Sequence, residues 1–71
     1  MTKQQAEIIL AYAENDMELR ATAKQIYLTD PAVVYHLKRI NEQTGRNPRK
    51  FYDLCYLVGV AVQRVGGKAN G

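Results

Sequence analysis

Apolar residues recur along this chain at the spacing of amphipathic helices, and they divide it into four helical segments. The first helix is expected over about residues 3–14. Thr2 and Gln5 have the spacing of a capping box, in which each side chain accepts a hydrogen bond from the backbone amide of the other. Asn15 and Asp16 should end this helix, because their side chains compete for backbone hydrogen bonds. Its predicted apolar face consists of Ile8, Ile9, Tyr12 and Ala13.

The second helix is expected to be short. Leu19, Ala23 and Ile26 recur at helical spacing, which predicts a helix over about residues 19–27. Ala23 is small enough to let another helix approach closely. Only a few residues, Tyr27 to Asp30, connect it to the next helix, so the two helices should share one core.

The third helix is expected over about residues 31–43. Thr29 or Asp30 can cap its start, and Pro31 fits the first helical position, where a missing amide hydrogen costs nothing. Gly45 suits the left-handed conformation that ends a helix. The predicted buried face consists of Val33, Leu37 and Ile40, and the predicted outward or lateral positions are Tyr35, His36, Lys38, Arg39 and Glu42.

The fourth helix should begin at Asn47 and Pro48, which have the pattern of a cap followed by a proline at the first helical position. Gly66 and Gly67 should end it. The sequence thus predicts an all-α fold, a compact four-helix domain containing a helix-turn-helix over residues 1–66, followed by a flexible tail over residues 67–71. The apolar positions of the last helix are Phe51, Leu54, Cys55, Leu57, Val58, Ala61 and Val62.

Composition agrees with one small globular domain. The 71 residues are 46% hydrophobic, which is too apolar for a disordered chain. No apolar run is long enough to span a bilayer, and the N-terminus lacks a secretory signal. The single cysteine, Cys55, cannot form an internal disulfide, so a reducing cytoplasm is the expected compartment, and we interpret Cys55 as a small core residue. Met1 favours a free-standing protein over a domain cut from a longer one.

Charge is distributed unevenly along the chain. Ten Lys and Arg against seven Asp and Glu give a net charge of +3. Acidic residues outnumber basic ones up to Asp30, whereas Glu42 is the only acid between His36 and Lys50. A basic centre of this kind is expected when one face of a domain meets phosphate. The basic residues of that central stretch are Lys38, Arg39, Arg46, Arg49 and Lys50.

A helix, a tight turn and a second helix with an outward basic face form the arrangement that places a recognition helix in the major groove of DNA. The third helix would leave Tyr35, His36 and Arg39 available to double-stranded DNA, with Lys38 nearer the flank. The residues expected to contact phosphates are Arg46, Arg49 and Lys50, around the start of the fourth helix. The structural alternatives are that these basic side chains are ordinary solvated surface and that Tyr35 packs against the preceding helix.

Catalysis is not expected. The chain has neither a Gly-rich phosphate loop nor a paired metal-ligand spacing, and His36 has no second His or Cys nearby. A Cys55–His36 catalytic pair would require the two side chains to meet, but the periodicity places Cys55 inward and His36 outward. We therefore expect no enzyme, no cofactor, no metal and no small-molecule substrate.

The joint pattern of the chain resembles a known family. The strings are residues 21–28 (ATAKQIYL), 33–40 (VVYHLKRI) and 44–48 (TGRNP), and the likeness extends from about Ala6 to Val62. They are similar to the C-terminal helix-turn-helix domain of the purine catabolism regulator (PucR-like) family, a domain that sugar-diacid regulators also carry. The resemblance implies a transcription-factor DNA-binding domain whose third helix reads the DNA. By position, the family's exposed reader residues fall at Asp30, Pro31, Ala32, Tyr35, His36 and Arg39.

The sequence departs from the family at the start of the reader helix. The family usually has basic and amide residues where this chain has Asp30 and Pro31, and a capping serine where it has Arg20. Two hypotheses follow. The first is a DNA-binding transcriptional regulator that forms a homodimer through the fourth helix, which has more apolar positions than one small core can hide. The alternative is a protein–protein interaction module that keeps the helix-turn-helix fold but has lost DNA binding.

Overall fold

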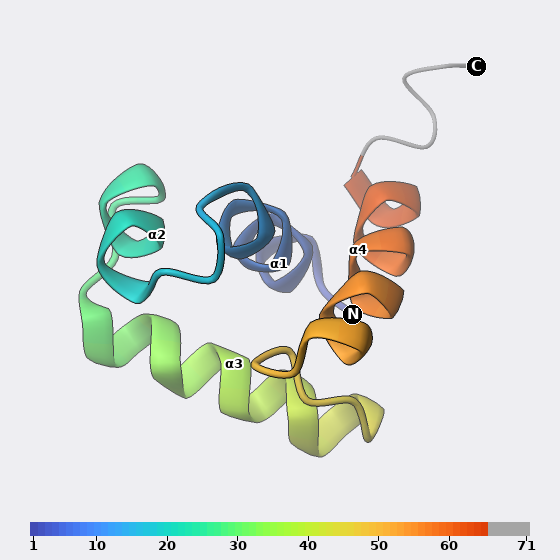
Figure 1. The fold of residues 1–71 in the computed structure, drawn as a ribbon. Helices are drawn as coiled ribbons and strands as arrows, with labels where there is room; N and C mark the ends of the chain where they lie inside the picture. The colour runs from blue at the N-terminus through green and yellow to red at the C-terminus, as the bar shows by residue number, and fades with distance from the viewer. Residues whose placement is uncertain (66–71) are drawn as a thin grey trace.

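In the part of the chain that the structure describes, three helices pack around a first one. The computed structural model describes residues 1–65, and its helices are α1 (Lys3–Glu14), α2 (Leu19–Gln25), α3 (Asp30–Thr44) and α4 (Phe51–Val65). Helix α1 contacts each of the other three helices, α2 packs on α3, and α4 packs on α1 (Figure 1). Within residues 1–65 there is no strand, so the predicted all-α fold with a helix-turn-helix is confirmed.

The start and end of α1 follow from side chains that the sequence singles out. The Thr2 hydroxyl accepts a hydrogen bond from the Gln5 amide at 3.0 Å, and Gln5 Oε1 accepts one from the Thr2 amide at 3.0 Å, so the capping box is confirmed. At the other end, the Asn15 side chain donates to the Ala11 carbonyl at 2.7 Å. Asp16 and Met17 then adopt left-handed backbone conformations, with φ of 56° and 66°, which turn the chain toward α2.

Helices α2 and α3 differ slightly from the expected bounds. Helix α2 ends at Gln25 rather than Tyr27, because Tyr27 adopts a left-handed conformation (φ 59°) that a helix cannot continue. Of the two candidate caps, Thr29 is the one used, since its hydroxyl accepts a hydrogen bond from the Ala32 amide at 3.2 Å. Helix α3 therefore begins one residue before Pro31, and Gly45 (φ 74°) ends it in the left-handed conformation as expected.

The expected start of α4 is wrong. Asn47 and Pro48 belong to a separate turn, in which the Asn47 side chain accepts a hydrogen bond from the Arg49 amide and its carbonyl accepts one from the Lys50 amide. The helix itself begins at Phe51. Pro48 is buried, so it fills space beneath the turn instead of opening the helix. The expected end at Gly66 and Gly67, and the tail over residues 67–71, lie outside the described residues.

The core confirms the predicted apolar face of α3 and only part of that of α4, where Phe51 and Val62 are exposed. The buried face of α3 consists of Val33, Leu37 and Ile40, as the spacing predicts. Cys55, however, is exposed, because the side of α4 that faces α1 is lined by Leu54, Leu57 and Ala61. No helix among residues 1–65 combines the length and the apolar character that crossing a membrane requires. The buried apolar cluster consists of Ala6, Ile8, Ile9, Tyr12, Ala23, Val33, Leu37, Ile40, Leu54, Leu57 and Ala61.

Candidate nucleic-acid interface

The connection between α2 and α3 is a tight turn held from below by apolar side chains. Ala23 is buried in α2, and its carbonyl accepts a hydrogen bond from the Leu28 amide at 2.9 Å across the turn. Ile26 and Leu28 are half-buried and pack against the core. This turn fixes α3 against α2 on one side, which leaves the opposite side of α3 exposed to solvent.

The exposed side of α3 carries most of the residues that the sequence proposes for base contact. Tyr35, Lys38 and Arg39 are exposed, and His36 is half-buried. The rings of Tyr35 and His36 lie edge to face with their centroids 5.4 Å apart, so the two side chains hold each other in place. Tyr35 is 57% exposed, so more than half of this residue is accessible to a partner.

An ion pair lies at the start of α3. The Nε atom of Arg20, in the first turn of α2, lies 3.5 Å from the Oδ2 atom of Asp30. The sequence reasoning treats both residues as departures from the family and does not pair them. The signal that could have paired them is their opposite charge at the starts of two helices joined by a short turn.

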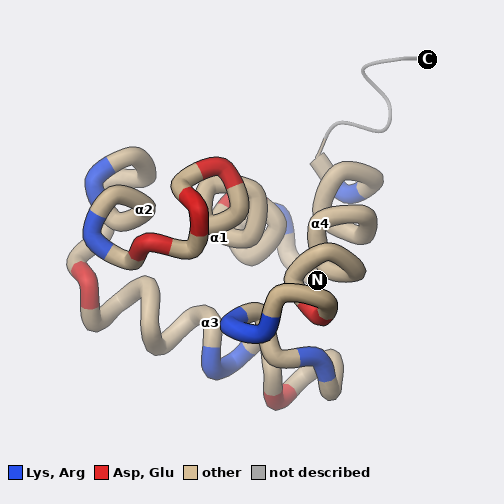
Figure 2. Tube along the Cα trace, viewed as in Figure 1, with Lys and Arg blue, Asp and Glu red and all other residues tan. Residues whose placement is uncertain are grey.

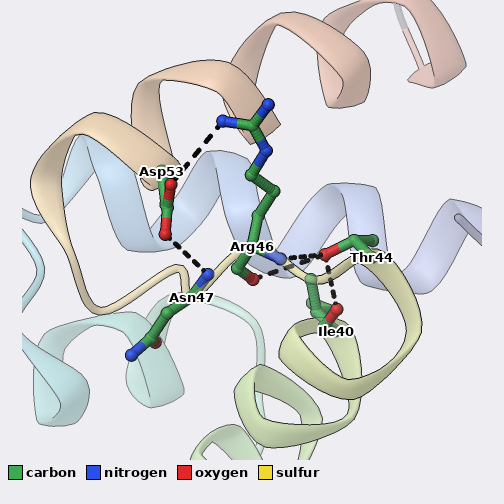
Figure 3. A network of polar contacts seen from close by, with 5 residues as sticks. All are labelled: Ile40, Thr44, Arg46, Asn47 and Asp53. Carbon is green, nitrogen blue, oxygen red and sulfur yellow. Dashed lines mark hydrogen bonds and ion pairs between the residues drawn. The ribbon is translucent and has the colours of Figure 1, made fainter.

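The segment between α3 and α4 is organised by a polar network around Asp53 (Figure 3). Asp53 Oδ2 accepts a hydrogen bond from the Asn47 amide at 3.0 Å, and Asp53 Oδ1 lies 3.7 Å from a guanidinium nitrogen of Arg46. The Thr44 hydroxyl donates to the Ile40 carbonyl and accepts from the Arg46 amide. The same guanidinium lies 4.1 Å from the ring centre of Tyr56 on α4. Arg46 thus faces α4, and its side chain remains 46% exposed.

Arg49 and Lys50 lie on the other side of this connection. Both are exposed, at the turn that Asn47 caps. Arg49 and Lys38 line the same groove between α3 and the connection, a space of about 240 Å³ whose other lining residues include Asn41 and Asn47. Figure 2 shows the basic segments of α3 and of the α3–α4 connection gathered in one region, away from the acidic segments between α1 and α2. The structure therefore brings Lys38 and Arg49 together, whereas Arg46 is directed toward α4.

Comparison with known families decides what kind of helix-turn-helix this is. The model of the PucR C-terminal helix-turn-helix domain matches residues 5–61 of the chain. The chain belongs to this family. The matched range begins in α1, contains α2 and α3 and reaches into α4, so the family assignment rests on the whole arrangement and not on the turn alone. No curated protein and no solved structure matches the chain.

The expected departures from the family lie at the starts of two helices, with Arg20 in the first turn of α2 and Asp30 and Pro31 in the first turn of α3. Asp30 is the first residue of α3, and Pro31 and Ala32 follow it in the first turn. Farther along α3, the exposed polar residues Tyr35, Lys38 and Arg39 remain available. Helix α3 therefore keeps an exposed polar face beyond a first turn that lacks basic side chains.

Proposed function

We propose that this domain binds double-stranded DNA with α3 in the major groove and acts as the DNA-binding part of a transcriptional regulator in a bacterial cytoplasm. The observation that carries the proposal is the exposed face of α3 flanked by the basic connection to α4, in a domain of the PucR C-terminal helix-turn-helix family. A recognition helix presents the side chains of its exposed face to base edges in the major groove. Helix-turn-helix domains serve regulation, and a catalytic role is not part of the proposal.

The proposed contacts divide by position. Tyr35, His36 and Arg39 lie on or beside the face of α3 that would enter the groove, where an arginine pairs with guanine through two hydrogen bonds. The residues proposed for phosphate contact are Lys38, Arg46, Arg49 and Lys50. Arg46 would contact a phosphate with the exposed part of a guanidinium that is already oriented by Tyr56 and Asp53, which lowers the entropy lost on binding.

We further propose that α4 joins two copies of the chain. Tyr52, Tyr56 and Val60 recur at a spacing of four residues on α4 and are all exposed. Gly59 has no neighbouring atom within 4 Å of the position that a Cβ would take, so the backbone of a second helix can approach it closely. A second copy is the expected partner because helix-turn-helix proteins bind paired half-sites as dimers. The apolar residues Leu54 and Leu57 of the same helix are not part of the proposed dimer surface, since both are buried in the core.

The test is fluorescence anisotropy of a labelled random duplex titrated with the protein across a salt series. We expect binding that weakens steeply as salt rises, because phosphate contacts release counterions. Arg49→Ala should reduce the slope of log affinity against log salt by about 0.9, the value for one lost phosphate contact. Arg39→Ala should lower affinity for a selected site more than for random DNA.

The matched control is Arg64→Ala. Arg64 lies in the last turn of α4, and α4 runs away from α3 (Figure 1). This variant removes the same charge, and its slope should equal that of the wild type. A folded wild-type protein that binds no duplex at low salt would contradict the proposal and favour the alternative, an interaction module that presents the exposed face of α4 to another protein.

A further inference from the structure

We propose that Asp30 reads a cytosine in the major groove and that Arg20 positions the Asp30 carboxylate for this contact. The proposal rests on the proposed DNA-binding function and adds a base specificity to it. It also assigns a role to Asp30 and Arg20, two of the three positions at which the sequence is expected to differ from the family.

Asp30 occupies the part of the reader helix that meets base edges. It is the first residue of α3, directly after the capping residue Thr29, and the N-terminal residues of a recognition helix are the ones that contact bases. The next two residues, Pro31 and Ala32, have no hydrogen-bonding side chain. Asp30 is therefore the hydrogen-bonding side chain of the first turn. A carboxylate accepts a hydrogen bond from the exocyclic amine of cytosine, which the major groove exposes.

Arg20 offsets the repulsion between the Asp30 carboxylate and the DNA phosphates. An unpaired carboxylate beside DNA is repelled by the phosphates, but the Arg20 Nε atom lies 3.5 Å from Asp30 Oδ2. The ion pair uses this oxygen, which leaves Oδ1 as an acceptor for a base. The Arg20 side chain is 85% exposed, so the rest of its guanidinium can face a phosphate while it holds Asp30.

The same ion pair could serve stability alone, and the two roles predict different results. Exposed ion pairs contribute little to folding free energy, so its loss should change the melting temperature only slightly. A role in base reading changes which DNA the protein selects. The decisive readout is therefore base preference at one position, measured on variants whose folding is verified by circular dichroism.

The experiment selects binding sites from a random duplex library with the wild type, Asp30→Ala and Glu42→Ala. We expect one position per half-site where the wild type requires cytosine, and replacing that base pair should weaken wild-type binding by about five- to 150-fold. Asp30→Ala should bind the selected and the substituted duplex equally. Glu42→Ala is the matched control, because it removes an exposed acid from the second half of α3 and should keep the cytosine preference.

Arg20→Ala tests the positioning role. This variant leaves the Asp30 charge without its counterion, so binding should weaken on both the selected and the substituted duplex. The ratio of the two affinities should also fall toward one, because the carboxylate is no longer held in position for the cytosine. Combining Arg20→Ala with Asp30→Ala should restore much of the affinity without restoring the cytosine preference, because the repelling carboxylate is gone.

The outcomes separate this inference from the proposed function. If Asp30→Ala retains the full cytosine preference, or if the wild type binds duplex DNA with no such preference, the inference is overturned while DNA binding stands. If the wild type binds no duplex at all, both the proposed function and this inference are wrong.

Discussion

Single residues show where sequence reasoning succeeds and where it lacks a signal. Tyr35, Lys38 and Arg39 are exposed as expected, since the apolar spacing of Val33 and Leu37 fixes the opposite face of α3. No comparable spacing pattern predicted that Cys55 is exposed. Helix α4 has a broad apolar face on which Cys55 lies near the edge, and residue type alone does not tell where the buried part of that face ends.

Tyr27 is a second residue whose conformation its type does not predict. It adopts a left-handed backbone (φ 59°) just after the end of α2. At Gly45 the same conformation can be predicted from the sequence, because glycine adopts it without steric cost. A left-handed conformation costs a residue with a Cβ about 1–2 kcal/mol, and asparagine tolerates it better than tyrosine. The Tyr27 side chain is 94% exposed, so it contributes little packing to offset this cost.

Tyr27→Asn should therefore stabilise the domain by about 0.5–1 kcal/mol, which corresponds to a melting temperature several degrees higher. Thermal unfolding followed by circular dichroism measures the effect. Gln4→Asn is the control, since Gln4 is also exposed but lies in a helix, where asparagine is a weaker helix former than glutamine. Equal losses of stability in both variants would show that strain at Tyr27 is not relieved.

At the scale of elements, the helices followed from caps and spacing, but the start of α4 did not. The sequence Asn47–Pro48 has the pattern of a helix start, yet the chain makes a separate turn there and begins α4 at Phe51. The physical reason lies six residues downstream, where Asp53 accepts the Asn47 amide and holds the turn against α4. The local sequence cannot show whether Asn47 and Pro48 begin a helix or a separate turn, because a tertiary hydrogen bond selects between the two.

Asp53→Ala should lower the free energy of unfolding by about 1–2 kcal/mol, because it removes a charged acceptor from a half-buried amide and separates Arg46 from its partner. Asp53→Asn should lose less, since the amide oxygen can still accept from Asn47. Chemical denaturation measures both variants, with Glu7→Ala, a change at an exposed acid of α1, as the reference. A loss in Asp53→Ala no larger than in Glu7→Ala would show that the turn does not depend on this contact.

At the scale of the whole molecule, the arrangement around α1 explains why two surfaces remain for partners. Helix α1 is covered by the other three helices, so the outer sides of α3 and α4 are not used for the core (Figure 1). The outer side of α3 is polar and basic, which suits DNA, whereas that of α4 carries Tyr52, Tyr56 and Val60. The sequence predicted this difference in surface character in outline, because basic residues are concentrated in the third segment and apolar residues in the fourth.

If α4 joins two copies, Val60→Glu should shift the protein toward the monomer, since two like charges would face each other across the symmetric contact. Sedimentation velocity over a concentration series measures the shift. Gln4→Glu introduces the same charge on the exposed side of α1 and should leave the dimer unchanged. A wild-type protein that stays monomeric at high concentration would contradict the dimer proposal without affecting DNA binding by each copy.

The most direct test of DNA binding through α3 is a titration of ¹⁵N-labelled protein with a short random duplex at low salt, followed by amide chemical shifts. The account predicts that the largest changes fall on residues 30–42 of α3 and on residues 46–50 of the connection. It predicts small changes on the second half of α4. Changes concentrated on the exposed face of α4, or none at saturating duplex, would contradict α3 as the DNA-reading helix.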